Sequence, residues 1–451
     1  RGNVIDTRSW PATFCLGFVM ATLSPLTDIQ SIRREHSVSL SVIISRKAPM
    51  TRSTLTPAFH IPVLLLGRVR GAALLIALAL LTVFPGCARA TSATLAEAES
   101  ASSIAVDRTR AQAIVGNLRK ITADNGIEEL KSVNIGGIEQ WISVRGRDRD
   151  NPILLFIHGG PAVTEMPGSW FYQSAWEDYF TVVQWDQRGA GKTMASSDPE
   201  TLAQDLTLDR FVSDADELVA YLRESYGKEK IFVLGHSWGT IIGLNLALRR
   251  PEWLHAYIGM GQAINFEENE QLGTQFALQA ARMSGNQEAV KELESILPYP
   301  EPGKQLAIPK VITQRKWLTC FGGMTWNRHD LSFQEDAALL SPDYSKNDID
   351  ARDYIGITAM AILPEMANLD FTKITKVECP VFIFAGEHDQ ATSSLLAKRW
   401  FTKLQAPQKQ LVWFEDVAHE IQFEVPGKLL FHLVTDVRPL AVRAGDGPPA
   451  R

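Results

Sequence analysis

Cysteine is scarce in this 451-residue chain, which contains four. Only Cys320 and Cys379 follow residue 90. Two cysteines are too few for a disulfide framework, although they leave a single bridge open. No group of Cys and His residues has the spacing of a zinc site, so we expect no metal. The fold must therefore depend on a buried core, for which a hydrophobic content of 45% is ordinary.

Basic residues are also in deficit over most of the chain. The net charge is −6, yet residues 1–90 hold ten Lys and Arg against three Asp and Glu. The remainder is therefore clearly acidic. An acidic body argues against a nucleic-acid partner, because such proteins present basic surfaces to the phosphate backbone.

A long hydrophobic run is missing as well. The apolar run Ala72–Phe84 is too short for a typical membrane-spanning helix. A basic stretch from Met50 precedes it, and the small-residue site Ala88–Ala90 follows, as in a secretory signal. We expect residues 50–90 to direct export, to a bacterial periplasm or the medium; an uncleaved anchor attaching the protein to a membrane is the alternative. Cys87 resembles a lipoprotein box only loosely.

The rest of the chain divides by pattern. Residues 1–49 show no sustained period and are interpreted as an upstream extension, and the Ala- and Ser-rich residues 91–106 as a linker. Apolar runs then alternate with helical patterns at 208–224 and 239–248, which predicts an α/β fold with a mostly parallel sheet covered by helices on both faces. The expected strands are 140–144, 153–158, 179–185, 230–234, 255–260, 381–385 and 410–414.

This rhythm stops between two of the expected strands. Residues 262–370 are charged and helical in pattern, and we interpret them as a helical cap inserted into a core formed by residues 107–261 and 371–451. Open α/β sheets place their ligands at the carboxyl ends of the strands. We therefore expect the cap to cover that edge, although a domain without a role in substrate choice is the alternative.

A candidate nucleophile lies in Gly-His-Ser-Trp-Gly, where an expected strand runs directly into a helix. The pattern G-x-S-x-G at such a junction holds Ser237 in a cramped backbone conformation, from which its side chain projects outward. The flanking glycines leave room for this tight turn. The same letters could make a plain turn. A serine hydroxyl needs a base, a group that orients the base, and donors for the oxyanion before it can act as a nucleophile.

The later strands supply the first two of these partners. Asp389 follows one expected strand and His419 the next, so Ser237, Asp389 and His419 have the chain order of an α/β hydrolase triad. Glu387, a neighbour of Asp389, is the competing acid; His388 and Asp416 also lie nearby.

Two glycine-containing loops precede the serine. His-Gly-Gly-Pro makes Gly160 a candidate oxyanion donor beside the amide of Trp238. In Asp-Gln-Arg-Gly-Ala-Gly-Lys-Thr, Asp186 occupies the position where a phosphate-binding loop needs glycine, so nucleotide binding is not expected. We expect Asp186 and Arg188 to fix the loops near the site by charge-assisted contacts.

Together, HGGP, DQRGAGKT, GHSWG, GEHD and the loop containing His419 resemble α/β hydrolases of the proline iminopeptidase type, over about residues 132–436. The resemblance implies a serine hydrolase without a cofactor that removes an N-terminal residue, often proline, from small peptides. Ala162 and His236 depart from the family pattern, in which glycine is usual or frequent. These departures leave the triad intact but weaken the substrate assignment.

The expected mechanism is acyl transfer. His419 accepts the proton of Ser237, Asp389 orients the imidazole, the amides of Gly160 and Trp238 hold the oxyanion, and water releases the acyl-enzyme. A carboxylesterase or lactonase with the same triad is the alternative function, and a non-enzymatic ligand-binding protein is a third. Epoxide hydrolase or dehalogenase chemistry is disfavoured, because those relatives use an aspartate nucleophile.

An aminopeptidase must also bind a free ammonium group, and a buried cation needs an anion beside it. Four glutamates lie where the chain is expected to enter and leave the cap. They are Glu267, Glu268, Glu270 and Glu365. We expect at least one of them to contact the substrate amine, although such residues are more often solvated.

Overall fold

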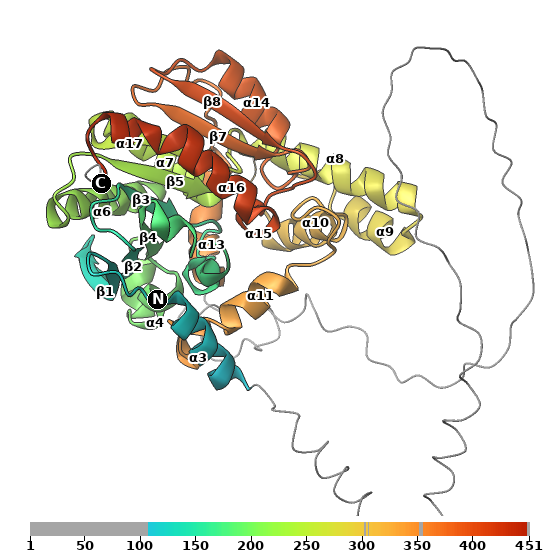
Figure 1. Ribbon diagram of the computed structural model, residues 1–451. Helices are drawn as coiled ribbons and strands as arrows, with labels where there is room; N and C mark the ends of the chain where they lie inside the picture. Colours follow the sequence, from blue (N-terminus) through green and yellow to red (C-terminus); the bar gives the residue numbers. More distant parts are fainter. Residues whose placement is uncertain (1–106, 302–303, 305, 351–354, 449–451) are drawn as a thin grey trace, which may run out of the picture. The chain divides into compact units, whose positions relative to one another are not determined.

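The computed structural model describes residues 107–448, except 302–303, 305 and 351–354, and these residues belong to one compact unit (Figure 1). The expected extension, signal segment and linker lie outside the described residues. Within the part of the chain that is described, no helix is both long and apolar enough to span a membrane. Cys320 and Cys379 are both free thiols.

Eight strands form one sheet in the order β1-β2-β4-β3-β5-β6-β7-β8. The two pairings between β1, β2 and β4 are antiparallel, and all the others are parallel. The strands are β1 Ile127–Ile135, β2 Ile138–Gly146, β3 Ile153–Ile157, β4 Thr181–Asp186, β5 Ile231–His236, β6 Leu254–Met260, β7 Val381–Gly386 and β8 Lys409–Phe414. The mostly parallel α/β sheet is confirmed, and the seven expected strands correspond to β2 through β8.

The first strand was not expected. β1 is mostly polar, with only scattered apolar residues, and only its two ends, Ile127 and Ile135, are buried. It is an edge strand paired to β2 alone. An edge strand with one solvated face needs no continuous apolar run, which is why this segment gave no strong strand signal.

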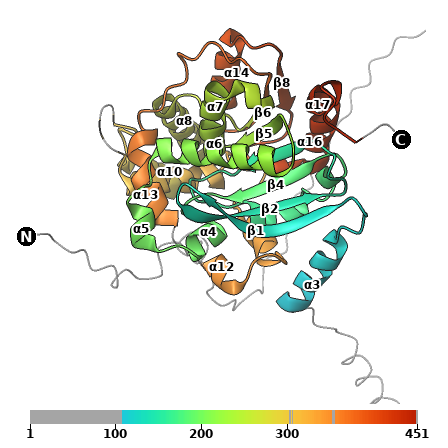
Figure 2. The same cartoon turned by 90° about the vertical axis from the view of Figure 1, so that its left-hand side faces the viewer.

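Two hydrophobic cores cover the two faces of the sheet, because successive side chains of a strand point to opposite sides. In β3, Leu155 packs in the core beneath α6 (Leu208–Ser225), α7 (Trp238–Arg249) and α14 (Ser394–Lys403). Its neighbour Phe156 packs in the other core, with α16 (Pro426–His432) and α17 (Pro439–Arg443). Figures 1 and 2 show these helices on either side of the sheet. Helices on both faces were predicted, and the prediction is confirmed.

The segment between β6 and β7, residues 262–370, is helical as expected. Its helices are α8 Phe266–Ser284, α9 Gln287–Ser295, α10 Ile308–Cys320, α11 Ser332–Leu339, α12 Lys346–Asp350 and α13 Ile355–Met366. We call residues 262–370 the inserted segment. α8, α9 and α10 pack on one another around a small core of their own that includes Ala277, Leu293 and Trp317.

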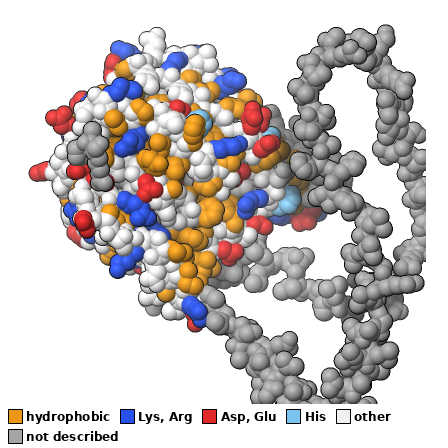
Figure 3. All heavy atoms as spheres, in the orientation of Figure 1, with side chains coloured by type: hydrophobic (Ala, Val, Ile, Leu, Met, Phe, Trp, Pro, Cys, Tyr) orange, Lys and Arg blue, Asp and Glu red, His pale blue; other side chains and the backbone are white. Residues whose placement is uncertain are grey.

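Four α-helices of the described chain lie outside the groups already given. They are α3 Arg108–Arg119, α4 Gly191–Ala195, α5 Pro199–Ala203 and α15 Ile421–Glu424. On the face shown in Figure 3, basic and acidic side chains are interspersed among hydrophobic ones, so this face carries charges of both signs.

Candidate active site

Ser237 lies at a sharp turn between β5 and α7. Its φ is 53° and its ψ −117°, a backbone conformation that side chains other than glycine rarely adopt. The flanking glycines are required by space. A Cβ on Gly235 would lie 2.4 Å from the carbonyl oxygen of Gly239, and a Cβ on Gly239 would lie 2.0 Å from that of Ile157. The turn therefore presents Ser237 at the carboxyl end of the sheet.

Asp389 and His419 are joined by a short, buried contact. His419 Nδ1 lies 2.8 Å from Asp389 Oδ2. The same carboxylate accepts the amide N–H groups of Ala391 and Thr392, each at 2.9 Å, and the Thr392 hydroxyl at 3.0 Å. These donors fix the direction of the Asp389 carboxylate, so that His419 Nδ1 carries the proton and Nε2 is left free. Glu387, the competing acid, is exposed, whereas Asp389 is buried.

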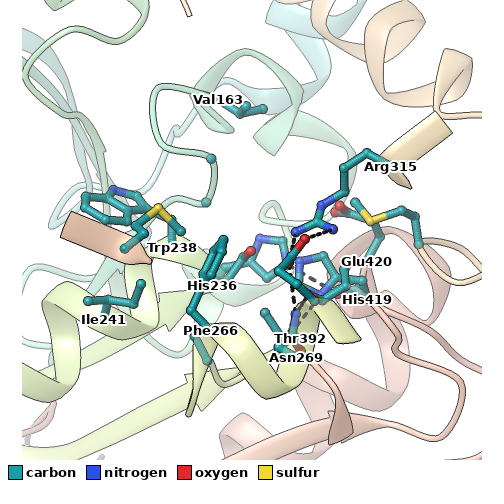
Figure 4. Close-up of a pocket in the computed structure, with 18 of the residues that line it drawn as sticks. Val163, His236, Trp238, Ile241, Phe266, Asn269, Arg315, Thr392, His419 and Glu420 are labelled. Atoms are coloured by element: carbon teal, nitrogen blue, oxygen red, sulfur yellow. Dashed lines mark hydrogen bonds and ion pairs between the residues drawn. The ribbon is translucent and has the colours of Figure 1, made fainter. Parts of the chain in front are cut away.

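Ser237 and His419 line one cavity of about 240 Å³ (Figure 4). Among the described residues no hydrogen bond joins the Ser237 hydroxyl to His419 Nε2. In enzymes without substrate, catalytic hydrogen bonds are often long and tighten only in the complex. Gly261 allows His419 to lie close to the end of β6, since a Cβ there would be 2.9 Å from the imidazole Cε1.

The two expected oxyanion donors line the same cavity. Trp238 is the first residue of α7, so its amide N–H has no partner within the helix. Gly160 has a φ of 118°, which only glycine adopts readily. Both amides therefore come from backbone that is fixed by local geometry next to Ser237.

The Asp-Gln-Arg loop after β4 contacts the chain on both sides of the oxyanion donors. Gln187 Nε2 donates to the carbonyl of His158 at 2.9 Å, and its Oε1 accepts the Trp238 indole at 3.0 Å. Arg188 forms a buried salt bridge with Asp214 at 2.9 Å. The loop thus contacts both the strand before the oxyanion glycines and the helix after the nucleophile.

Asp186 is completely buried at the start of this loop. It accepts the hydroxyls of Thr164 and Tyr344 and, at 2.7 Å, the amide of Lys192. Burial raises the pKa of Asp186 to about 6 although these donors oppose the rise. Tyr344 belongs to the inserted segment, so Asp186 also connects that segment to the core.

Comparison with known proteins agrees with the fold. The family described as "alpha/beta hydrolase fold" matches residues 152–426. The chain belongs to this family. This α/β hydrolase is similar to the "probable aminopeptidase YbaC" of Bacillus subtilis (strain 168). The two sequences are 28% identical over 313 residues, and the alignment covers 68% of this chain and 95% of that protein.

A second sequence relative and a solved structure are also similar to this chain. "Epoxide hydrolase 3" of Siraitia grosvenorii is 29% identical over 29% of this chain and 37% of its own length. The crystal structure of the proline iminopeptidase of Mycobacterium smegmatis superposes with a TM-score of 0.51 at 17% identity, covering 70% of this chain and 100% of that one. That likeness concerns the fold. Taken together, the matches confirm the resemblance to α/β hydrolases of the proline iminopeptidase type.

Of the four glutamates expected to contact the amine, one lines the cavity of this α/β hydrolase. Glu270 is completely buried there, but Arg315 Nη1 donates to its Oε2 at 3.0 Å and Nη2 also contacts Oε1. The Tyr299 hydroxyl donates to Oε2 at 2.7 Å. Both oxygens of Glu270 are therefore already occupied.

The other three lie outside the cavity lining. Glu267 is exposed on the first turn of α8, Glu268 pairs with Arg399, and Glu365 is exposed and accepts the amide of Leu208 at 3.1 Å. The helical pattern gave no way to decide which side of α8 faces the core.

Sequence reasoning missed a buried ion pair that lines the cavity beside the triad. His236, the residue before the nucleophile, has its Nδ1 2.5 Å from Glu165 Oε1. Burial lowers the pKa of His236, but the adjacent Glu165 carboxylate outweighs it and raises this pKa to about 9. Burial raises the pKa of Glu165, but the adjacent His236 outweighs burial and the net effect is a lowered pKa. His236 is therefore an imidazolium at neutral pH.

A second missed residue is Glu420, which follows His419 and lines the cavity. It is buried, and burial raises its pKa. The sequence offered one signal, an acid directly next to the expected base, but such pairs are common on solvated loops.

Two groups of side chains in the described part of the chain bring three possible metal ligands within 4.8 Å of one another. In the group His236, His419 and Glu420, both ring nitrogens of His236 and Nδ1 of His419 already have partners. The group Glu387, His388 and Asp416 lies at the surface with both acids exposed. Neither group offers a complete set of free, buried donors of the kind a catalytic metal takes.

Proposed function

We propose that this α/β hydrolase is a serine hydrolase acting through an acyl-enzyme, and that it is an aminopeptidase of the proline iminopeptidase type. The observation that carries the proposal is the buried Asp389–His419 pair opening on the same cavity as a serine in a strained turn. This is the arrangement of base, orienting acid and exposed hydroxyl that acyl transfer needs.

The chemistry follows from the positions of the atoms. With Nδ1 protonated toward Asp389, His419 Nε2 accepts the proton of Ser237 as its oxygen attacks the scissile carbonyl. The amides of Gly160 and Trp238 stabilise the oxyanion. His419 then protonates the leaving amine, and a water activated by the same nitrogen hydrolyses the ester on Ser237.

Aminopeptidase specificity is supported by the relative from Bacillus subtilis (strain 168), whose name is "probable aminopeptidase YbaC" and of which 95% is matched. It is also supported by the charge of the cavity. Three glutamates line it against Arg315 and the His236 imidazolium, while His419 is neutral when it acts as the base. An excess of one negative charge favours a cationic ligand.

The size and lining of the cavity support a small apolar residue as the acyl group. About 240 Å³ is available, and apolar side chains of the core and of the inserted segment surround it. They include Ile241, Ile264, Phe266, Met366 and Leu369. Side chains such as those of proline, alanine or leucine fit this surrounding.

A carboxylesterase or lactonase remains the alternative, because the same apolar lining accommodates a neutral ester. Epoxide hydrolysis is less well supported: the epoxide hydrolase relative matches 29% of this chain, and Ser237 stands where an aspartate would be needed.

A substrate panel tests the proposal. We expect kcat/KM for the arylamides of free Pro, Ala or Leu to exceed that for their N-acetylated forms by at least about tenfold, since a buried ammonium–carboxylate contact is worth more than about 1.4 kcal/mol. Short p-nitrophenyl esters serve as the comparison. Equal rates for blocked and free substrates would overturn the aminopeptidase proposal and favour an esterase.

A further inference from the structure

The α-ammonium of an aminopeptidase substrate cannot lie far from the triad. Two covalent bonds separate its nitrogen from the acyl carbon, which places the two atoms roughly 2.5 Å apart. The anion that binds this ammonium must therefore lie beside Ser237 and His419. Three carboxylates line the cavity, those of Glu165, Glu270 and Glu420, and their partners differ.

Two of the three are saturated by strong donors. Glu270 receives both guanidinium nitrogens of Arg315 and the Tyr299 hydroxyl. Glu165 contacts the His236 imidazolium on Oε1 and accepts Gln422 Nε2 on Oε2 at 3.0 Å. A substrate ammonium could reach either carboxylate only by displacing a partner already in place.

The side-chain hydrogen-bond donors to Glu420 are neutral amides. Gln422 Nε2 donates to its Oε2 at 2.9 Å, and Gln334 is the other side-chain amide near the carboxylate. Across residues 107–448 as described, no Lys, Arg or His forms a salt bridge with Glu420. Burial raises the pKa of Glu420, and the nearby His236 imidazolium opposes this rise only partly. The ring nitrogens of His236 contact Glu165 and the His419 carbonyl instead, so Glu420 has no cation paired directly with it.

Glu420 is also close to the catalytic base. It is the next residue after His419, and its carboxylate lies within 4.8 Å of a ring nitrogen of His419 and of His236. Figure 4 shows Glu420 and His419 side by side at one end of the cavity, near Arg315. When His419 is neutral and acts as the base, it does not compete with a substrate ammonium for Glu420. The Glu420 carboxylate would repel an anionic ligand.

We infer that Glu420 is the residue that binds the substrate's α-ammonium, and that the pair of Glu270 and Arg315 instead forms a wall of the cavity. This inference rests on the proposed aminopeptidase function and names the residue responsible for its specificity. A primary or secondary ammonium one carbon away from the acyl group is the substrate class that it selects.

The test is the ratio of kcat/KM for alanine or proline arylamide to kcat/KM for the N-acetylated arylamide. In Glu420→Gln we expect this ratio to fall by roughly 10- to 100-fold relative to the wild type, the range of a charge-assisted hydrogen bond. The ratio is used because any effect of the substitution on His419 changes both rates alike. Glu420→Ala is a second neutral variant, with the same expected fall, should Glu420→Gln fold poorly.

The matched control is the double variant Glu270→Gln, Arg315→Gln, which removes the other carboxylate while preserving the net charge. We expect its ratio to stay within about threefold of the wild type, a change of less than 0.7 kcal/mol or so. A wild-type preference that survives in Glu420→Gln and Glu420→Ala would overturn the inference and leave the aminopeptidase proposal standing. A wild type without any preference for free amines would overturn the proposed function itself.

Discussion

The imidazole of His236 lies against that of His419, with ring centroids 4.8 Å apart, and its Nε2 is 3.2 Å from the backbone carbonyl of His419. The residue before the nucleophile thus contacts the loop that carries the base. Because Glu165 keeps His236 protonated, both of its ring nitrogens donate. This contact helps to fix the distance between β5 and the His419 loop at the wall of the cavity.

The Glu165–His236 pair makes stability depend on pH in a defined direction. The pKa of His236 is raised from 6.5 to about 9, so its stabilisation is complete below pH ~6.5 and is lost as the pH rises through about 9. The shift corresponds to about 3 kcal/mol. We expect Glu165→Gln to be less stable than the wild type by up to this amount at pH 6, with the difference shrinking above pH 9.

Denaturant unfolding between pH 6 and pH 10 measures this difference. The other titratable groups facing His236 are Glu420, His419 and His158, and burial lowers the pKa of His158 to about 4, so it does not ionise in this range. A difference between wild type and Glu165→Gln that stays constant from pH 6 to pH 10 would show that the pair does not titrate as a unit.

The glycine after the nucleophile should tolerate no side chain. In Gly239→Ala the new Cβ would meet the Ile157 carbonyl oxygen at 2.0 Å, and both elements are buried. We expect a loss of about 3 kcal/mol or more in the free energy of unfolding, together with loss of activity. Gly427→Ala in α16 is the control: no atom lies within 4 Å of its Cβ, and alanine there should be neutral or stabilising by up to about 1 kcal/mol. Equal stability of the two variants would contradict the close packing of Gly239 against Ile157 in the turn that carries Ser237.

Glu270 and Arg315 should behave as a coupled pair. Arg315→Gln leaves the completely buried Glu270 without its cation, and we expect it to lower the free energy of unfolding by about 3 kcal/mol. Replacing both residues by glutamine should cost less than that single change. Thermal or denaturant unfolding of Glu270→Gln, Arg315→Gln and the double variant completes a double-mutant cycle. Strictly additive losses in the free energy of unfolding would refute the coupling.

We propose, from the sequence alone, that residues 50–90 direct export. The mature protein should then begin near Thr91, or at Cys87 if that residue is lipidated. Amino-terminal sequencing of the protein from its native host, after fractionation, checks this. Recovery of a soluble cytoplasmic chain that retains residues 68–84 would rule it out.

The parts of the site that depend on local sequence could be predicted. Ser237 lies between a strand and a helix, in a turn whose flanking positions, Gly235 and Gly239, have no room for a Cβ atom. The strand, the turn and the helix are adjacent in the chain. Asp389 and His419 each follow a strand, and the carboxyl ends of neighbouring parallel strands meet at one edge of a sheet. Position in the chain was therefore enough to bring them together.

The charged residues around the triad could not be predicted in the same way. Glu165 and His236 are 71 positions apart, and the helical pattern of residues 266–284 did not distinguish Glu270, which faces the cavity, from Glu267, which faces solvent. Whether a carboxylate is saturated or free depends on partners such as Arg315 from another helix. Such contacts arise only when the inserted segment packs on the core.

The central claim is that Ser237 is a nucleophile activated by His419 and Asp389. Intact-mass and peptide analysis after treatment with a fluorophosphonate tests it most directly. The account predicts a single adduct on the peptide containing Ser237 in the wild type, much slower labelling in His419→Ala, and none in Ser237→Ala, whose arylamide and ester hydrolysis should fall by several orders of magnitude. An unlabelled wild type, an adduct on another residue, or normal turnover by folded Ser237→Ala would contradict it.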